Sequence, residues 1–171
     1  MDALHDTVER SAPLSGHSPD QYRPIGGYAA LTGLFFSLAA GFALWFRRSG
    51  RALPEEMRPR DLALLSIAAQ KASRTLAADR VTSAVRAPFT EYEGDAGPGE
   101  VHEQARGRGL RRAVGELLVC PFCLGMWMSA GFTAMLLVWP RATRWLASVW
   151  VIFFGSEMLQ IAYRKAESSL G

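Results

Sequence analysis

Long uncharged apolar stretches alternate with arginine-rich connectors along this chain. The uncharged stretches cover residues 25–46, 117–139 and 145–163, and only Glu157 interrupts the last one. A helix over the first stretch extends about 33 Å at 1.5 Å per residue, which is enough to cross a hydrocarbon core about 30 Å thick. The pattern predicts three transmembrane helices, and the last two form an antiparallel hairpin over 117–163 because their connector is short.

A fourth periodic segment, residues 61–78, is less apolar. Its apolar side chains recur at helical spacing on one face, whereas Lys71 and Arg74 lie away from that face. This pattern is typical of an amphipathic helix that lies in the membrane interface. A full span would place both cations near the bilayer centre, at a cost of roughly 2.5–3.5 kcal/mol each. We therefore expect an interfacial helix; the alternative, a fourth span, would move the two cysteines to the outer face.

The connectors complete an all-α integral membrane fold. Arginines gather before residue 61 and again before the second uncharged run, so the positive-inside rule places residues 47–116 in the cytoplasm. Residues 1–24 are then a mobile extracytoplasmic tail, and residues 164–171 form a cytoplasmic tail. Acidic residues, glycines and a proline over 89–109 indicate a mobile loop.

Composition narrows the classes of partner. The chain has a net charge of +3, and its arginines flank the apolar stretches instead of forming a basic face with aromatic readers. This distribution argues against nucleic-acid binding and is explained by membrane topology. We expect the lipid bilayer and other membrane subunits, or a second copy of the chain, as partners.

The two cysteines of the chain belong to the segment Cys120-Pro121-Phe122-Cys123, with Trp127 one turn further on. This spacing is compatible with a redox dithiol like that of glutaredoxins, but no strand precedes it and no second cysteine pair is present. It also supplies half of a zinc site, which His102 with Glu103 or Glu116 as oxygen donors, or another protomer, would have to complete. Packing at the start of a helix is the third interpretation, and we favour it. On the cytoplasmic side the pair would be reduced.

Three sequence segments carry a family resemblance. They are Lys71-Ala72-Ser73-Arg74 with Asp79-Arg80-Val81, then Val85-Arg86-Ala87-Pro88-Phe89, and finally the stretch from Gly115 to Trp127 that contains the cysteines. From about residue 60 to 163 the chain resembles a bacterial family of small membrane proteins known as domain of unknown function 1360. The resemblance implies a membrane protein of the bacterial inner membrane and implies no reaction.

Charged side chains near the apolar runs are the remaining candidates. Glu157 within a span needs a partner, for which Arg112, Lys71 or Arg74 are in reach by depth. Glu116 just before the second span is expected to pair with Arg74, Arg80 or Arg86, or to stabilise a helix start. The residues that we expect to form structural or interaction contacts are Arg74, Asp79, Arg80, Arg86, Glu116, Trp127 and Glu157.

No nucleophile with a base and no phosphate-binding loop is evident in the sequence. We therefore predict a non-enzymatic multi-pass protein that serves as a structural or accessory subunit of a membrane assembly. The alternatives are a thiol-disulfide or metal-binding redox protein that uses Cys120 and Cys123, and a small oligomeric transporter or channel that uses Glu157.

Overall fold

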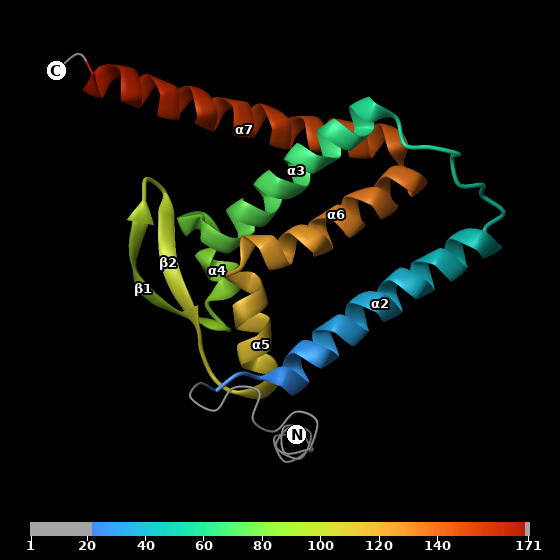
Figure 1. Cartoon of the computed structure of the whole chain (residues 1–171), viewed down its shortest axis with the longest axis horizontal. Helices are drawn as coiled ribbons and strands as arrows, with labels where there is room; N and C mark the ends of the chain where they lie inside the picture. Colours follow the sequence, from blue (N-terminus) through green and yellow to red (C-terminus); the bar gives the residue numbers. More distant parts are fainter. Residues whose placement is uncertain (1–21, 170–171) are drawn as a thin grey trace.

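The computed structural model of the protein describes residues 22–169. Within this range the long helices are α2 (Ile25–Arg48), α3 (Pro59–Ala78), α6 (Pro121–Val138) and α7 (Pro140–Ser168) (Figure 1). Between α3 and α6 lie η1 (Arg80–Thr82), α4 (Ser83–Arg86), β1 (Thr90–Gly97), β2 (Glu100–Ala105) and α5 (Gly109–Leu118). Helices α2, α6 and α7 are long and apolar enough to cross a membrane, as predicted. The tail expected over residues 1–24 lies outside the described residues except for its last three.

Prolines determine where α6 and α7 begin. Pro121 and Pro140 each occupy the first turn of their helix, where a missing N–H has no consequence. A residue before proline avoids the helical region, and Cys120 accordingly has φ −106° and ψ 100°. The uncharged run over 117–139 is therefore divided between α5 and α6. Helix α7 begins at Pro140 and ends at Ser168. It therefore includes the short connector expected before residue 145 and most of the C-terminal tail expected over 164–171.

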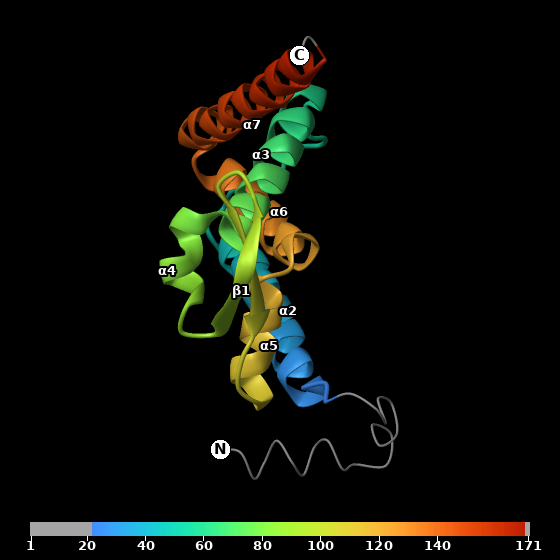
Figure 2. The ribbon, with the colours of Figure 1, turned by 90° about the vertical axis from the view of Figure 1, so that its left-hand side faces the viewer.

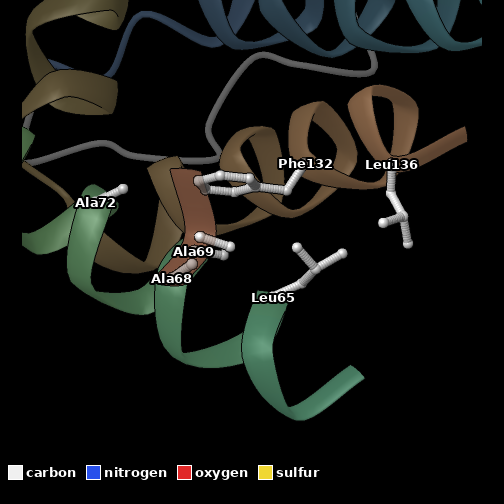
Figure 3. Close-up of a cluster of buried hydrophobic side chains, with 7 residues drawn as sticks. Leu65, Ala68, Ala69, Ala72, Phe132 and Leu136 are labelled. Carbon is white, nitrogen blue, oxygen red and sulfur yellow. The ribbon is translucent and has the colours of Figure 1, made fainter. Parts of the chain in front are cut away.

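Helix α3 lies between α6 and α7, and the three together enclose the main apolar core (Figures 1 and 2). The buried residues of this core are Leu65, Ala68, Ala69 and Ala72 of α3, Phe132 and Leu136 of α6, and Ala147 of α7 (Figure 3). Alanine side chains let neighbouring helices approach closely. The sequence pattern placed Lys71 on the exposed side of this helix, and that expectation is wrong: Lys71 is 1% exposed.

Helices α2 and α6 run in the same direction. At one end Tyr28 of α2 lies beside Glu116, just before α6, and the rings of Phe35 and Trp127 are 5.1 Å apart. Towards the other end, Phe46 and Leu137 line one shared groove. The expected three-span topology puts the starts of these two helices on opposite sides of the membrane, which requires them to be antiparallel. The structure differs because α5 binds the first turns of α2 (Figure 1).

An antiparallel β-hairpin occupies the segment expected to be an acidic loop, so the fold is mostly helical but not all-α. Strands β1 and β2 pair from Thr90 with Ala105 to Gly97 with Glu100. The turn uses Pro98 and Gly99, and Gly99 has a φ of +81° that other residues rarely adopt. The acidic composition of this segment indicated a mobile loop, and Pro98 and Gly99 were not recognised as the turn of a hairpin.

Candidate functional site

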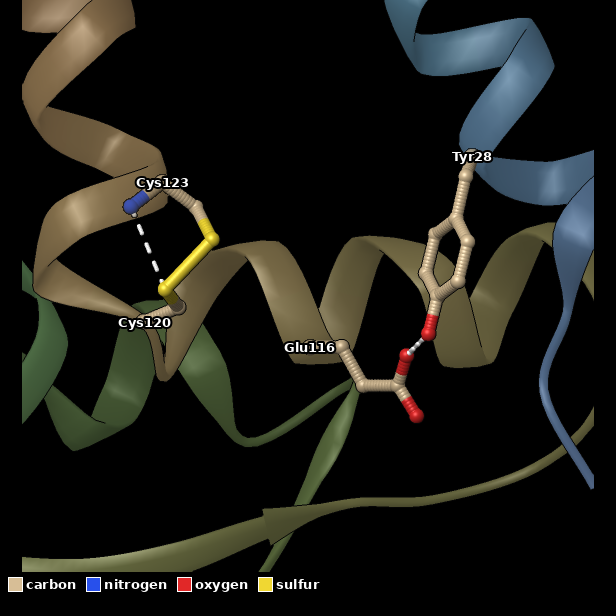
Figure 4. Close-up of a disulfide and its surroundings, with 4 residues drawn as sticks. All are labelled: Tyr28, Glu116, Cys120 and Cys123. Carbon is tan, nitrogen blue, oxygen red and sulfur yellow. Dashed lines mark hydrogen bonds between the residues drawn. A yellow bond between two sulfur atoms is a disulfide. The ribbon is translucent and has the colours of Figure 1, made fainter. Parts of the chain in front are cut away.

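The cysteine pair lies at the start of α6, where α5 and α6 meet at an angle (Figure 4). Cys120 is the N-cap of α6, and its Sγ accepts a hydrogen bond from the backbone N–H of Cys123 at 3.1 Å. The two side chains are joined by a disulfide, and their Cα atoms are 5.2 Å apart. Because the disulfide leaves no thiolate, the zinc hypothesis applies only to the reduced protein. The expectation of a reduced pair differs from the structure.

Around the disulfide, aromatic residues point in two directions. Phe122 is 93% exposed, whereas Trp127, one turn further along α6, makes an edge-to-face contact with Phe35 of α2. Trp127 therefore connects two apolar helices. Phe122 presents a bare apolar side chain at the beginning of α6.

Glu116 connects α5 to the start of α2. Its carboxylate accepts a hydrogen bond from the hydroxyl of Tyr28 and another from Nε of Arg112 at 2.9 Å (Figure 4). Gly27 lies so close to Ala113 that a Cβ on it would be 2.6 Å from the alanine Cβ. The predicted partners of Glu116 were Arg74, Arg80 or Arg86, which precede it in the chain. The observed partners are Arg112, one helical turn away, and Tyr28 in the first apolar helix.

Glu157 of α7 pairs with Lys71 of α3, one of the three partners that its depth suggested. The Lys71 Nζ lies 2.6 Å from the carboxylate and 4.4 Å from the ring centroid of Phe153. The lysine side chain is 2% exposed and the glutamate side chain 31%. A cation without water needs such partners, and here an anion and an aromatic face supply them.

A second ion pair, between Asp61 and Arg144, joins the other end of α3 to α7. Two hydrogen bonds of 2.8 Å connect the guanidinium to both carboxylate oxygens. Sequence reasoning missed this pair because Asp61 reads as an ordinary first-turn residue and Arg144 as a topology signal. The two pairs together fasten α3 to α7 along its length.

The largest fully buried side chain of the described residues is that of Arg86. Arg86 is fully buried and donates to the Glu103 carboxylate from Nε and Nη2, both at 3.0 Å. It also donates to the carbonyls of Leu76 and Asp79 and to the hydroxyl of Thr82. Arg86 thereby ties the C-terminal end of α3 to α4 and β2.

Glu103 completes this network. Besides Arg86, its carboxylate accepts hydrogen bonds from the hydroxyls of Ser83 at 2.6 Å and Thr90 at 2.7 Å. Burial raises the pKa of the Glu103 carboxyl, but the hydrogen bonds from Arg86, Ser83 and Thr90 and the charge of Arg86 outweigh burial, so that the pKa lies below its ordinary value. Arg86 was predicted from the sequence; Glu103 entered only as a metal donor, since its strand was not foreseen.

The segments between α3 and α6, from η1 to α5, form a polar module. The remaining predicted residues, Arg74, Asp79 and Arg80, lie where the end of α3 meets the exposed face of this module. Arg74 makes a two-pronged contact with Glu100 at the hairpin turn, and Arg80 donates to Asp95 at 2.7 Å. Asp79 contributes its backbone: its carbonyl accepts a hydrogen bond from Arg86, and its main chain pairs with that of Glu100 as an isolated β-bridge. These contacts hold the β-hairpin against the end of α3.

The predicted charged residues form ion pairs and hydrogen bonds within the chain. Over residues 22–169, no group of three or more histidine, cysteine, aspartate and glutamate side chains is arranged to hold a metal ion. The cavities are lined by residues of α2, α3, α6 and α7, and those between helices are mainly apolar. The arrangement joins segments of the chain to one another.

Comparison with known proteins agrees with the residues that carry the resemblance. A family described as "Protein of unknown function (DUF1360)" matches residues 64–163. "Sporulation protein YjcA" of Bacillus subtilis (strain 168) is 35% identical over 88 residues, which are 50% of this chain and 75% of the relative. No solved structure matches the chain. The matched family segment contains α6, most of α3 and α7, and the whole polar module between them, and the chain belongs to the DUF1360 family.

Proposed function

We propose that this protein is a non-enzymatic, multi-pass membrane protein that acts as an accessory subunit of a membrane assembly. The observation that supports this role is that the charged residues of the family segment join α3, the β-hairpin and α7 to one another. A network of this kind makes a rigid body, and it leaves the apolar outer faces of α2, α6 and α7 for lipid and partners. The name of the Bacillus subtilis relative assigns that protein to sporulation and names no reaction.

The test is a tagged full-length chain purified from its own host membranes in mild detergent. We expect a membrane protein to copurify at fixed stoichiometry, and we expect its abundance to fall when the gene for this chain is deleted. Replacing Cys120 and Cys123 by serine should leave both results unchanged. A chain that purifies alone, together with a deletion phenotype reproduced by the double serine variant, would instead support the thiol-disulfide alternative.

We also propose that α3 crosses the bilayer as a fourth span. Helices α2 and α6 run in the same direction, and two helices that enter from the same side must be joined by an intervening crossing. With 20 residues, α3 is long enough at roughly 30 Å. Lys71 is neutralised by Glu157, which removes most of the cost that argued for an interfacial helix.

This topology changes the predicted side of the cysteines. With the N-terminus outside, the four crossings place the disulfide, the β-hairpin and the end of α7 outside as well. A disulfide persists in an oxidising compartment. The short connectors around Arg51 and Arg141 are then cytoplasmic, where the positive-inside rule favours arginines, whereas the arginines of α5 lie outside. Of these, Arg111 donates to the carbonyl of Pro88 and Arg112 pairs with Glu116.

Thiol labelling separates the two topologies. After mild reduction of intact cells, a membrane-impermeant maleimide should modify Cys120 or Cys123. As a matched control, a Ser49→Cys variant without the native cysteines should react only after lysis. If both sites react only after lysis, the cysteine pair lies in the cytoplasm together with residue 49, and the fourth span is contradicted.

A further inference from the structure

An apolar groove separates α2 from α6 and has a volume of about 710 Å³. One wall is formed by Phe42 and Phe46 of α2, and the other by small residues of α6 such as Ala130 and Ala134. A Cβ placed on Gly131, which also lines the groove, would meet no atom within 4 Å. This part of the interface between the two helices is therefore not closed by the chain's own side chains.

The two ends of the groove differ. At one end the edge-to-face pair of Phe35 and Trp127 brings the helices together. At the other end the groove is lined by Arg47, at the end of α2, and by Leu53 of the connector. Between Trp127 and Leu137, α6 rises roughly 15 Å, which gives the length of the groove along this helix.

The lining of the groove is mainly apolar and favours an apolar occupant. An acyl chain of a lipid is flexible and has no polar groups, so it follows an apolar groove without leaving hydrogen-bonding groups unpaired. The groove therefore suits a lipid tail.

Charge adds a second requirement. Arg47 is exposed at the open end, and in the described chain it has no ion-pair partner. With the N-terminus outside, this end faces the cytoplasmic leaflet, which contains the anionic lipids. A guanidinium binds a phosphate through several charge-assisted hydrogen bonds.

We propose that the groove between α2 and α6 binds an anionic glycerophospholipid of the surrounding bilayer. Arg47 holds the headgroup phosphate, and one acyl chain lies along Phe42, Phe46 and Ala134 towards the Phe35–Trp127 pair. The lipid thus fills the contact that the side chains leave open and fixes α2 beside α6. The site requires α2 and α6 to lie in a bilayer with the N-terminus outside, but it does not depend on the accessory role.

Native mass spectrometry of the full-length chain tests this site, with equal amounts of phosphatidylglycerol and phosphatidylcholine added in mild detergent. The wild-type chain should retain phosphatidylglycerol preferentially. Arg47→Gln should weaken that retention about fivefold, the effect of one basic residue near a charged membrane surface. Arg48→Gln changes the neighbouring arginine, which does not line the groove, and should have no effect.

Filling the groove should displace the tail. Ala134→Leu should abolish retention of both lipids, whereas Ala162→Leu on an exposed part of α7 should not. Ala39→Leu fills the groove from α2 and serves if the first variant does not fold. Equal retention by the groove-filling and control variants overturns the proposal. A dimer that the groove-filling variants dissociate also overturns it, because a second copy would then be the occupant.

Discussion

Lys71 illustrates how far a single residue depends on its surroundings. Helical periodicity assigned it to the solvent side of its helix, yet it lies almost fully buried against Glu157 and Phe153. The periodicity describes one apolar face, but α3 is packed on two sides, by α6 and by α7. A carboxylate on α7 converts what would be an unfavourable position into a cross-link.

Removing one partner of this pair tests the cross-link. Lys71→Met leaves Glu157 without its cation, and we expect a loss of about 1–3 kcal/mol, less than a fully buried pair because the glutamate is 31% exposed. Thermal unfolding in detergent measures the loss. The exposed pair of Arg80 and Asp95 gives the control, since Arg80→Gln should change stability by about 0.5 kcal/mol or less. Equal losses of stability in the two variants would mean that the buried pair stabilises the fold no more than an exposed one.

Glu103 predicts a dependence of stability on acid. Its folded-state pKa lies below the ordinary value of 4.5, so the unfolded chain binds this proton more tightly. The stabilisation is therefore complete above about pH 4.5 and declines as pH falls through the lower, folded-state pKa. Glu103→Gln should be less stable at neutral pH and should lose less stability between pH 6 and pH 3 than the wild-type chain, as followed by melting temperature. Parallel curves would contradict the role of this carboxylate.

At the scale of elements, the packing of α5 against the β-hairpin depends on one missing side chain. A Cβ on Gly115 would lie 2.5 Å from the carbonyl oxygen of Phe89 and 2.9 Å from the Cβ of Ala105. The helix approaches the base of the hairpin this closely only because residue 115 is glycine. Glycine is a poor helix former, so the close contact with the hairpin must outweigh the lower helix propensity of this residue.

Gly115→Ala should therefore destabilise the protein despite the better helix propensity of alanine. We expect a loss of about 1–3 kcal/mol from forced separation of α5 and the hairpin. Gly41→Ala in α2 is the matched control, because a Cβ there would meet no atom within 4 Å. The control should be neutral or slightly stabilised in thermal melts. A neutral Gly115→Ala would show that the contact yields easily.

At the scale of the whole molecule, the direction of α2 relative to α6 decides the topology. The contacts of Tyr28 with Glu116 and of Phe35 with Trp127 place both helix starts at one end. Such contacts between distant segments leave no trace in hydropathy. The counting of uncharged runs alone yields three spans and an antiparallel arrangement.

Reporter fusions after residue 171 test the proposed four crossings. Alkaline phosphatase fused there should be active and green fluorescent protein should be dark, since the end of α7 then lies outside. Fusions placed in the 49–58 connector should behave in the opposite way. Fluorescence of both the C-terminal fusion and the connector fusion would restore the three-span arrangement.

The sequence by itself determined the apolar helices, the proline-defined start of α6 and the family of the chain, because these depend on local composition and on motifs of adjacent residues. It also indicated that Glu157 needs a partner, since a carboxylate in an apolar run cannot stay alone. Only the tertiary structure decided that Lys71 is that partner, that Glu103 completes the Arg86 network, and that an acidic segment forms a hairpin. Each of these depends on two segments meeting in space, where pairing and burial outweigh the preferences of either segment alone.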